Sequence, residues 1–581
     1  MRNIIVNDEI STRFKYVFGG VVLFAVAILI QLFRWQIIHN AEYEAAAKVL
    51  VASDYSYKTE RGLIYDCNMT VLATDEPSWF VYISVGNNTL DTRNYEAHQT
   101  EIKNRLFEVL SLTDEEIEAI NKYPMSYIPI KHGVTEEMRK QIQEEDLFGV
   151  YFSEEYKRVY PNGKLASNVL GYIGKNENGT EEGYYGVTGY FYKDLVGYQG
   201  YVEGERDISG DLILLGDYDQ IRPKKGKDIV LTLDVTIQRK VEDVLKKGVV
   251  DTGAKSGSAI VMDPKTGKII AMATYPTYDP NEYYKIMSYE NLRNRCISNS
   301  YEYGSINKVV TISSAMDYGL IDEDYICDDK YGYMKIYDRT IYTWDKRPDG
   351  VQTPVDVLRN SNNVCSAKIG LEMSYEQQYR KLKEFGLVDP ININLAGEET
   401  GWCPEPALWS DVDQATISFG QTFSATPLQV VSAISTIAND GDRMQPYVVE
   451  KVISEDGEVV YKPKVVARPV SKETAEKMRG MLGDIISDSS ISPQFDALKE
   501  YKIGGKTGTS QIPISDVGSG NTGYREDVTN ATFVGFAPYD NPQVIMLVWI
   551  EEPTSHTLAN QTAVPIWVQM FDSIKNDVIE L

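Results

Sequence analysis

Histidine is scarce in this chain of 581 residues, which contains four. His556 is the only histidine after residue 132, so a Ser-His-Asp triad in the C-terminal half would have to use it. No G-x-S-x-G turn, which exposes the nucleophile of α/β-hydrolases, surrounds Ser305. The sequence therefore disfavours a histidine base in that half of the chain.

Cysteine is scarce as well. The five cysteines are far apart and odd in number, at Cys67, Cys296, Cys327, Cys365 and Cys403. This spacing indicates neither a zinc site nor a dense disulfide framework. A bridge from Cys327 or Cys403 to Cys365 is an alternative, but we expect buried free thiols.

Positive charge is also in short supply, since 58 Lys and Arg face 84 Asp and Glu for a net charge of −26. This balance argues against a nucleic-acid partner, which would require a basic surface. The chain is too long for one core, because single cores rarely exceed about 250–300 residues. We therefore expect more than one domain.

Charge is absent from one long stretch, Tyr16 to Phe33, which as a helix of 18 residues would span about 27 Å. Arg13 and Lys15 precede it and predict a cytoplasmic N-terminus. We expect a cytoplasmic tail at 1–15, an uncleaved transmembrane helix at 16–38, and all later residues outside the cell. The rival is a signal peptide cleaved near Ala45-Ala46-Ala47.

Two domains are expected after this segment. Residues 39–225 read as an elongated stalk of short strands and helices, including helices that begin at Thr113 and Thr135. A basic, turn-prone link near 222–227 leads into a second domain at 226–581. Helices packed on an antiparallel sheet make that domain α+β. We expect strands at Ile229–Leu233, Ser258–Met262, Lys268–Ala273, Ile503–Thr509, Ala531–Phe536 and Val544–Ile550, and helices at Thr236–Lys247, Val357–Ile369 and Gln429–Ile437.

Ser305 and Lys308 stand three residues apart at the start of a helical pattern that ends near Gly319. This spacing places both side chains on one face, about 5–6 Å apart between Cβ atoms. A buried lysine can lose its proton near neutral pH and then accept the serine proton as the serine oxygen attacks a carbonyl. Alone, S-x-x-K is a weak signal. It gains weight because Ser361-Asn362-Asn363 and Lys506-Thr507-Gly508-Thr509 follow in order.

With these three motifs the chain resembles the class B penicillin-binding proteins, which are membrane-anchored peptidoglycan D,D-transpeptidases. The resemblance covers nearly all of the chain and implies a transpeptidase domain of the serine β-lactamase-like fold behind a dimerisation-type pedestal. It extends to segments outside the motifs: Arg61 to Asn68, Arg158 to Pro161, Thr232 to Asp234 with Gln238, Tyr275 to Asn281, Gly420 to Gln429 and Phe533 to Pro538.

The resemblance implies a role for each residue of the first two motifs. Ser305 would be the acylated nucleophile, and Lys308 would be its base. Ser361 would relay a proton between Lys308 and the leaving amine. Asn363 would hydrogen-bond the peptide of the substrate.

The third motif would bind the substrate. Lys506 would direct positive charge toward the substrate carboxylate and help to keep Lys308 neutral by repulsion. The hydroxyls of Thr507 and Thr509 would bind that carboxylate, and Gly508 would let the substrate approach the strand. The backbone N–H groups of Ser305 and Thr509 would form the oxyanion hole.

Three positions in and beside the first motif depart from the family pattern. Tyr303 replaces a proline, and Ile306 and Asn307 stand where a threonine and an apolar residue are usual. Asn307 is polar where an apolar side chain normally packs. We expect this difference to bear on the rate or on antibiotic affinity, and not on the identity of the nucleophile.

The reaction implied is acyl transfer. Ser305 attacks the penultimate D-alanine of a stem peptide, D-alanine leaves, and the amine of a neighbouring stem peptide resolves the acyl-enzyme. β-Lactams would acylate Ser305, no metal or cofactor is required, and a polytopic membrane glycan polymerase is the expected partner. The rivals are a D,D-carboxypeptidase or β-lactamase, a non-catalytic scaffold or β-lactam sensor, and a fused polymerase, for which the stalk is too short.

Overall fold

The computed structural model describes residues 2–34, 56–57, 59–85, 89–123, 127–177, 179–198, 200–204, 218–221, 223–514 and 523–580. These residues divide into two compact units. The first comprises Met1–Arg61, Glu76–Lys157 and Val196–Gly226, and the second comprises Gly62–Asp75, Arg158–Leu195 and Lys227–Leu581. This division assigns two segments of the expected stalk, 62–75 and 158–195, to the C-terminal unit, so the continuous stalk over 39–225 stays a prediction.

Helix α1 (Arg2–Phe33) contains residues 16–33 of the expected membrane segment. Residues 35–38 of that segment, the start of the stalk and the alternative cleavage site at 45–47 lie outside the described residues. The expected transmembrane helix finds no support, because no helix within the described residues is both long enough and apolar enough to cross a bilayer.

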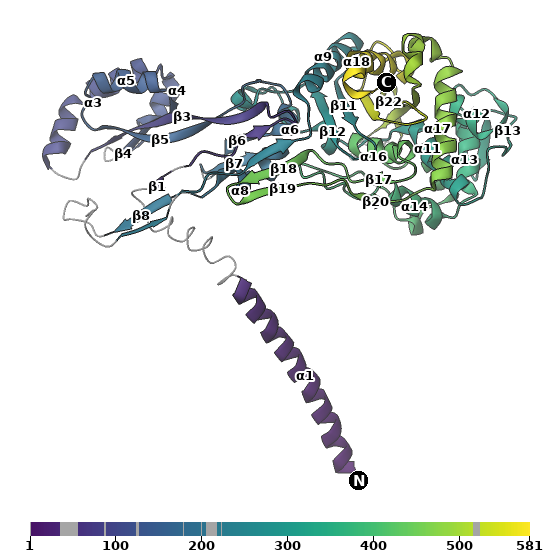
Figure 1. Cartoon of the computed structure of the whole chain (residues 1–581), viewed down its shortest axis with the longest axis horizontal. Coiled ribbons are helices and arrows are strands. Elements are labelled where there is room, and N and C mark those ends of the chain that lie inside the picture. Colours follow the sequence, from purple (N-terminus) through teal and green to yellow (C-terminus); the bar gives the residue numbers. More distant parts are fainter. Residues whose placement is uncertain are drawn as a thin grey trace. The chain divides into compact units, whose positions relative to one another are not determined.

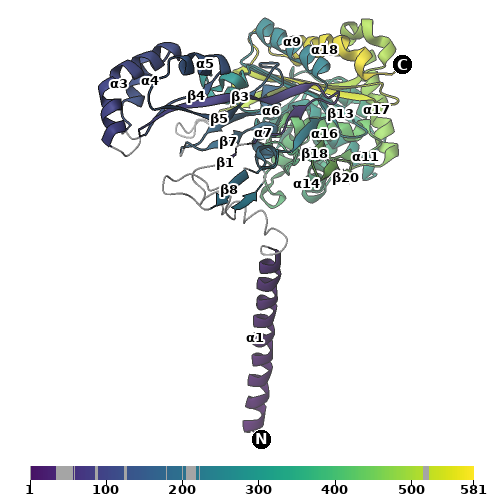
Figure 2. The same cartoon turned by 60° about the vertical axis from the view of Figure 1, so that its left-hand side comes forward.

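The first unit has its own small apolar core, formed where helices cover strands (Figure 2). Val81 and Ile83 of β3 (Val71–Ser84) pack with Tyr95 and Leu106 of α3 (Thr89–Val109), and all four are fully buried. The capping box expected at Thr113 is present, since the Glu116 amide donates to the Thr113 hydroxyl and the Thr113 amide donates to the Glu116 carboxylate. Besides α1, the elements are β1 (Ser56–Tyr57), the later part of β3 (Val71–Ser84), α3 (Thr89–Val109), α4 (Asp114–Ile120), β4 (Tyr127–Val134), α5 (Glu136–Glu144), β5 (Val150–Val159), β8 (Gly200–Gly204) and β9 (Tyr218–Ile221).

The second unit is built on a five-stranded antiparallel sheet with the order β12-β11-β23-β22-β21 (Figure 1). Strands β11 and β23 are buried on both faces because helices cover each side. Alternate residues such as Ile260 and Leu547 face one core, and Ala259 and Val548 face the other. The strands are β11 (Ser256–Met262), β12 (Ile269–Tyr275), β21 (Gly504–Pro513), β22 (Tyr524–Ala537) and β23 (Val544–Glu551). This layered α+β architecture is the expected one.

Helices α9 (Val235–Thr252) and α18 (Ala563–Val578) cover one face of the sheet, and α11 (Asn307–Asp317), α16 (Pro427–Ala438) and α17 (Lys472–Ser487) lie on the other side (Figure 1). The remaining strands and α-helices of this unit are β2 (Ile64–Tyr65), α6 (Ser167–Leu170), β6 (Tyr172–Lys175), β7 (Glu181–Tyr184), α7 (Gly186–Tyr190), α8 (Tyr192–Val196), β10 (Asp228–Leu231), α10 (Arg295–Ser298), β13 (Cys327–Asp329), β14 (Tyr333–Ile336), β15 (Arg339–Tyr342), β16 (Gly350–Gln352), α12 (Pro354–Arg359), α13 (Asn363–Leu371), α14 (Tyr375–Glu384), α15 (Asp411–Ile417), β17 (Arg443–Met444), β18 (Val449–Ser454), β19 (Gly457–Val460) and β20 (Val465–Ala467).

One expected helix, Val357–Ile369, is wrong as a single element. Helix α12 ends at Arg359, and α13 begins at Asn363. Between them Ser361 has φ +54°, a left-handed conformation that no helix interior adopts. The next residue, Asn362, caps α13 by accepting a hydrogen bond from the Cys365 amide. The break lies at the second motif, so Ser361 and Asn362 stand between two helices and not inside one.

Candidate active site

Ser305 lies in a single 3₁₀ turn, Gly304–Ile306, that leads directly into α11. Gly304 has φ +62°, and a Cβ at this position would lie 2.8 Å from the Thr509 carbonyl oxygen. Glycine is therefore required twice, by its conformation and by the close approach of β21. The helix ends near Gly319 as expected, and Lys308 is in its first turn.

The Lys308 amine lies at the centre of the site. Its Nζ is 2.8 Å from the Ser305 Oγ, 2.6 Å from the Ser361 carbonyl oxygen and 2.8 Å from the Asn363 Oδ1, and it is 3.2 Å from the Ser361 Oγ. A neutral amine has two N–H donors and one lone pair, and the two carbonyl-type oxygens can only accept. With both donors so engaged, the lone pair is left for the serine hydroxyls.

The orientation of the Asn363 amide supports this assignment. Its Nδ2 donates to the Tyr342 carbonyl oxygen at 3.1 Å, so its Oδ1 faces Lys308. The backbone of Tyr342 therefore sets which end of the Asn363 side chain the lysine meets. The acceptor at Lys308 is fixed by the fold and does not depend on a substrate.

Burial favours the neutral form of this lysine. Lys308 is fully buried, and desolvation lowers its pKa well below the ordinary value, with the nearby charge of Lys506 adding to the effect and Asp349 opposing it. Burial also lowers the pKa of Lys506, to about 7. The site thus contains two buried amines, one of which touches the candidate nucleophile.

The third motif lies on β21, whose residues alternate between the cavity and the interior. Thr507 and Thr509 line the cavity, and the Lys506 Nζ donates to the Ser361 Oγ at 3.3 Å. Gly508 faces the other way: a Cβ there would lie 2.3 Å from the Tyr303 carbonyl oxygen. The packing of the Ser305 turn against the strand explains this glycine, whereas we had expected it to make room for a substrate.

Ser305 opens into a cavity of about 900 Å³ that also contains Ser361, Asn363 and Lys506. One side of the cavity is β21, which contributes Lys506, Thr507, Thr509 and Gln511, here called the strand wall. Other lining residues come from the segment 327–363, here called the loop wall, which includes the β14–β15 hairpin. All eight residues expected at the site are thus brought together, Gly508 by its backbone.

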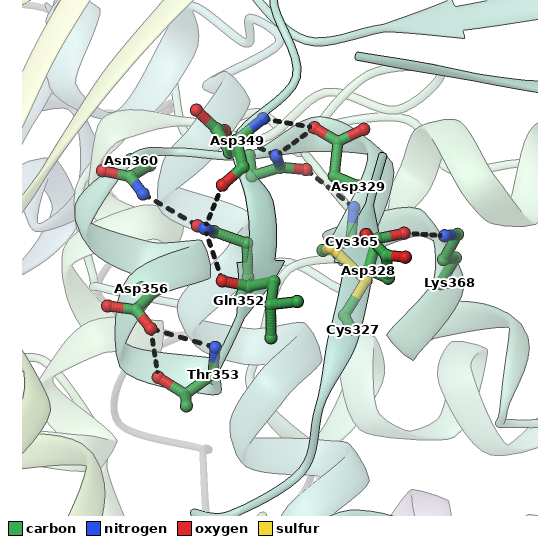
Figure 3. The surroundings of a disulfide bond; sticks show 12 residues. Cys327, Asp328, Asp329, Asp349, Gln352, Thr353, Asp356, Asn360, Cys365 and Lys368 are labelled. Carbon is green, nitrogen blue, oxygen red and sulfur yellow. Dashed lines mark hydrogen bonds between the residues drawn. A yellow bond between two sulfur atoms is a disulfide. The ribbon is translucent and has the colours of Figure 1, made fainter. Parts of the chain in front are cut away.

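A disulfide joins Cys327 of β13 to Cys365 of α13 (Figure 3). Cys327 is the first residue of the loop wall, and Cys365 lies two residues after its end. The expectation of free thiols is wrong for this pair, because β13 lies beside the helix that follows the second motif. Cys67, Cys296 and Cys403 are free, as expected, but only Cys296 is buried, and Cys67 and Cys403 are partly exposed. The bridge ties the start of α13, two residues after Asn363, to the strand at the other end of the loop wall.

Hydrogen bonds around the bridge hold the same segment. The Asn362 Nδ2 donates to the carboxylates of Asp329 at 2.7 Å and Asp349 at 2.6 Å (Figure 3). The Asp329 carboxylate also accepts from the Gly332 amide. Asn362, the middle residue of the second motif, is therefore a support, while its neighbours Ser361 and Asn363 face Lys308.

Two departures from the family pattern bind each other. The Tyr303 hydroxyl donates to the Asn307 Oδ1 at 3.0 Å, and the Asn307 Nδ2 donates to the Ile417 carbonyl oxygen at 2.5 Å. Both side chains are fully buried. Asn307 is thus satisfied in the interior, and the tyrosine supplies the partner that an apolar neighbour would lack.

Sequence reasoning missed the hairpin that forms part of the loop wall. Tyr342, Thr343, Trp344 and Lys346 line the cavity, and the only signal was a run of aromatic residues between 331 and 344. The described residues contain no group of three or more His, Cys, Asp or Glu side chains placed to hold a metal ion.

Comparison with known proteins agrees with this geometry. The model of the penicillin-binding protein transpeptidase domain matches residues 257–569, and that of the penicillin-binding protein dimerisation domain matches residues 56–231. Stage V sporulation protein D of Bacillus subtilis is 29% identical over 560 residues, covering 94% of this chain and 83% of that protein.

Two further relatives cover most of the chain. A probable peptidoglycan D,D-transpeptidase, PbpC of Pseudomonas aeruginosa, is 28% identical over 435 residues, or 74% of this chain and 72% of that protein. The crystal structure of penicillin-binding protein 2X from Streptococcus thermophilus superposes with a TM-score of 0.70 at 23% identity, covering 90% of this chain and 80% of that one. At this identity the superposition speaks for the fold alone.

Proposed function

We propose that this chain, which belongs to the class B penicillin-binding proteins, is a peptidoglycan D,D-transpeptidase that acts through an acyl-enzyme on Ser305. One observation carries the assignment of the nucleophile. The Lys308 Nζ lies 2.8 Å from the Ser305 Oγ while its two donors are engaged by the Ser361 carbonyl and the Asn363 amide. A neutral lysine so held has its lone pair available for one hydroxyl proton.

In the first half-reaction, the Ser305 Oγ bonds to the carbonyl carbon of the penultimate D-alanine and its proton passes to the Lys308 Nζ. Ser361, whose Oγ lies 3.2 Å from that nitrogen, relays a proton to the leaving nitrogen as the C–N bond breaks. D-Alanine departs, and an ester remains on Ser305. The Lys308 amine is neutral again at the end of this step.

In the second half-reaction, the amine of a neighbouring stem peptide attacks the ester carbon. The Ser305 oxygen leaves and recovers a proton that the attacking amine gives up through the same pair. The product is a new peptide bond between two stem peptides. Both halves pass through a tetrahedral oxyanion, for which we assign the backbone N–H groups of Ser305 and Thr509, each worth about 3–4 kcal/mol in comparable sites.

The strand wall would bind the C-terminal carboxylate of the substrate. Thr507 and Thr509 line the cavity, and Lys506 places positive charge behind them. A β-lactam presents a carboxylate and a strained amide in the same relation, so it would acylate Ser305 in place of the peptide. Penicillin binding is the property for which this family is named.

Membrane attachment belongs to the same proposal. Its support is the uncharged stretch of 18 residues from Tyr16 to Phe33, preceded by Arg13 and Lys15. We assign an anchor at 16–38, an N-terminus inside the cell, and a catalytic unit outside it. A polytopic glycan polymerase in the same membrane would supply the glycan strands that the enzyme cross-links.

Intact-protein mass spectrometry after exposure to benzylpenicillin tests the nucleophile. We expect one covalent adduct, located at residue 305 by peptide mapping and absent from Ser305→Ala. A folded wild-type protein that stays unmodified at saturating drug would end the proposal and favour the non-catalytic scaffold. Product analysis with a stem-peptide donor and an amine acceptor separates cross-linking from the hydrolysis that a carboxypeptidase or β-lactamase would perform.

A further inference from the structure

The cavity that contains Ser305 carries positive charge although the chain is strongly acidic. Four basic side chains line it, Arg339, Lys346, Arg359 and Lys506, against a single carboxylate, Asp413. The whole chain has 58 basic and 84 acidic residues, so this ratio is the reverse of its composition. Asp413 is itself engaged, since its carboxylate accepts hydrogen bonds from the amide and hydroxyl of Ser410.

The four basic groups differ in their partners. Arg359 pairs with Asp356 at 2.7 Å, and Lys506 is buried against Ser361. Arg339 and Lys346 have no carboxylate within ion-pair distance in the described part of the chain, and both side chains are exposed. Each is therefore available to an anion that enters the cavity.

Both free cations belong to the segment that forms the β14–β15 hairpin and the residues directly after it. Arg339 is on β15 of the hairpin, and Lys346 follows it, with its Nζ 5.6 Å from the centre of the Tyr342 ring. Beneath them Ile336 and Ile341 are buried against α13 and α15, together with Phe419. The cations are thus anchored to elements that also hold the second motif.

The hairpin is connected to the chemistry by its backbone. The carbonyl of Tyr342 accepts the hydrogen bond from Asn363, whose other end meets Lys308. Exposed aromatic rings flank the two cations, because Tyr342 and Trp344 both line the cavity. A ligand on this wall would meet aromatic faces and positive charge beside the amide that touches the catalytic lysine.

We propose that Arg339 and Lys346 form a carboxylate-binding subsite for the donor stem peptide, recognising an acidic residue that precedes its D-Ala-D-Ala terminus. The inference rests on the proposed function. The strand wall would take the terminal carboxylate, so an upstream carboxylate of an extended peptide is left for another cationic part of the same cavity. Arg339 and Lys346 are the exposed cations without a carboxylate partner among the described residues that line it. A guanidinium binds a carboxylate through two parallel hydrogen bonds, and the lysine adds a point charge. Tyr342 and Trp344 cover the apolar stem of the acidic residue.

The test is competition against fluorescent penicillin on the full chain. An acidic pentapeptide ending in D-Ala-D-Ala should slow labelling of wild-type protein, and the same peptide with its upstream carboxylates amidated should do so more weakly. In Arg339→Gln/Lys346→Gln we expect the acidic peptide to compete about 5- to 10-fold less well, which is the scale of two solvent-exposed ion pairs. The amidated peptide should compete equally in both proteins.

The chain offers a matched control. Lys330→Gln/Lys335→Gln removes the same two charges from the same segment, but neither side chain lines the cavity. We expect this variant to match wild type for both peptides, and each competition is expressed relative to the rate at which penicillin alone labels the same protein. Added salt should weaken the acidic peptide on wild type and not on Arg339→Gln/Lys346→Gln.

Three results would overturn the subsite. The first is that the acidic peptide competes equally well on wild type and on Arg339→Gln/Lys346→Gln. The second is that the amidated peptide loses as much competition on Arg339→Gln/Lys346→Gln as the acidic peptide does. The third is that the acidic peptide loses as much competition on the control variant Lys330→Gln/Lys335→Gln. Absence of competition by any peptide on a protein that penicillin still labels would also remove the subsite and leave the nucleophile assignment intact. Absence of penicillin labelling in wild type would remove both proposals.

Discussion

The two walls of the Ser305 cavity are built in different ways. On the strand wall, Lys506, Thr507 and Thr509 pair with Val534, Phe533 and Ala531 of β22, and those partners are fully buried. The loop wall has two short two-stranded ladders, one disulfide, and the Asn362 side chain bridging two aspartates. A sheet distributes its support over many residues, whereas the loop wall depends on a few contacts that single substitutions can remove.

Lys308 lies where the two walls meet, and its replacement should have the largest effect. Lys308→Met removes the base without leaving an unpaired charge, so we expect the rate of acylation by benzylpenicillin to fall about 10²- to 10⁴-fold. The loss of unfolding free energy should stay within about 1–3 kcal/mol, because the cost of desolvating the amine is removed while the Ser361 carbonyl and the Asn363 amide oxygen each lose a donor. Stopped-flow labelling measures the rate, with the exposed Lys335→Met as control. Labelling within tenfold of wild type would show that another group removes the serine proton.

The strand wall has a buried charge of its own, and it makes stability depend on pH. The pKa of Lys506 is lowered to about 7 from 10.5. Between these values the unfolded chain binds more protons at this residue than the folded chain does, so the free energy of unfolding rises with pH from 7 to 10.5. The rise attributable to Lys506 is on the order of 4 kcal/mol. Urea unfolding at pH 7, 8 and 9 should therefore show that the free energy of unfolding rises more steeply with pH for wild type than for Lys506→Met. An equal rise with pH in the two proteins would contradict the assignment.

The disulfide is the strongest single support of the loop wall. It closes a loop of 38 residues, so the double variant Cys327→Ser/Cys365→Ser should lose about 3–4 kcal/mol of unfolding free energy. We also expect slower acylation, because α13 carries Asn363 and is no longer tied to β13. Cys67→Ser, which changes a free and partly exposed thiol, should alter stability by less than about 1 kcal/mol. An unchanged acylation rate in the double variant would show that the hydrogen bonds of Asn362 alone hold the wall.

The same contrast separates what the sequence can predict from what it cannot. Residues 531–536 and 544–550, in the strands that support the strand wall, are expected as strands and are strands, because buried apolar runs carry a local signal. The expected helix over 357–369 is wrong because the break at Ser361 and Asn362 is held by side chains distant in sequence. Asp329 lies 33 residues before Asn362, and Cys327 lies 38 residues before Cys365. No local pattern reports such partners.

In the candidate site, too, the sequence predicts local contacts and does not predict features that depend on distant residues. The spacing of Ser305 and Lys308 predicted their contact, because both lie on one helical turn. The order of the motifs indicated that Ser361 and Lys506 would join them, but spacing could not supply the left-handed conformation of Ser361. The aromatic hairpin was missed, since exposed aromatic residues in a loop carry no periodicity.

The Ser305 turn can be tested for dependence on single hydrogen bonds. Asn307→Leu leaves the buried Tyr303 hydroxyl without a partner and removes one of two hydrogen bonds to the Ile417 carbonyl, which still accepts from the Gly420 amide, so it should cost about 1–3 kcal/mol of unfolding free energy. Tyr303→Phe should cost about 1 kcal/mol. In the double variant the two losses should be less than additive by about 1 kcal/mol, because the tyrosine hydroxyl is no longer stranded. Chemical denaturation of the four proteins measures the coupling, and strict additivity would mean that the two side chains do not act as a pair.

The smallest effect should come from a site that supports the cavity from behind without facing it. Gly480 is in α17, and a Cβ added there would meet no atom within 4 Å. Alanine lowers the backbone entropy of the unfolded chain, so Gly480→Ala should raise the free energy of unfolding by about 0.5–1 kcal/mol. Acylation should stay at the wild-type rate, because neither wall is altered. If the acylation rate of Gly480→Ala changed together with its free energy of unfolding, the cavity would respond to the overall stability of the unit. The difference between the two walls would then not explain which substitutions slow acylation.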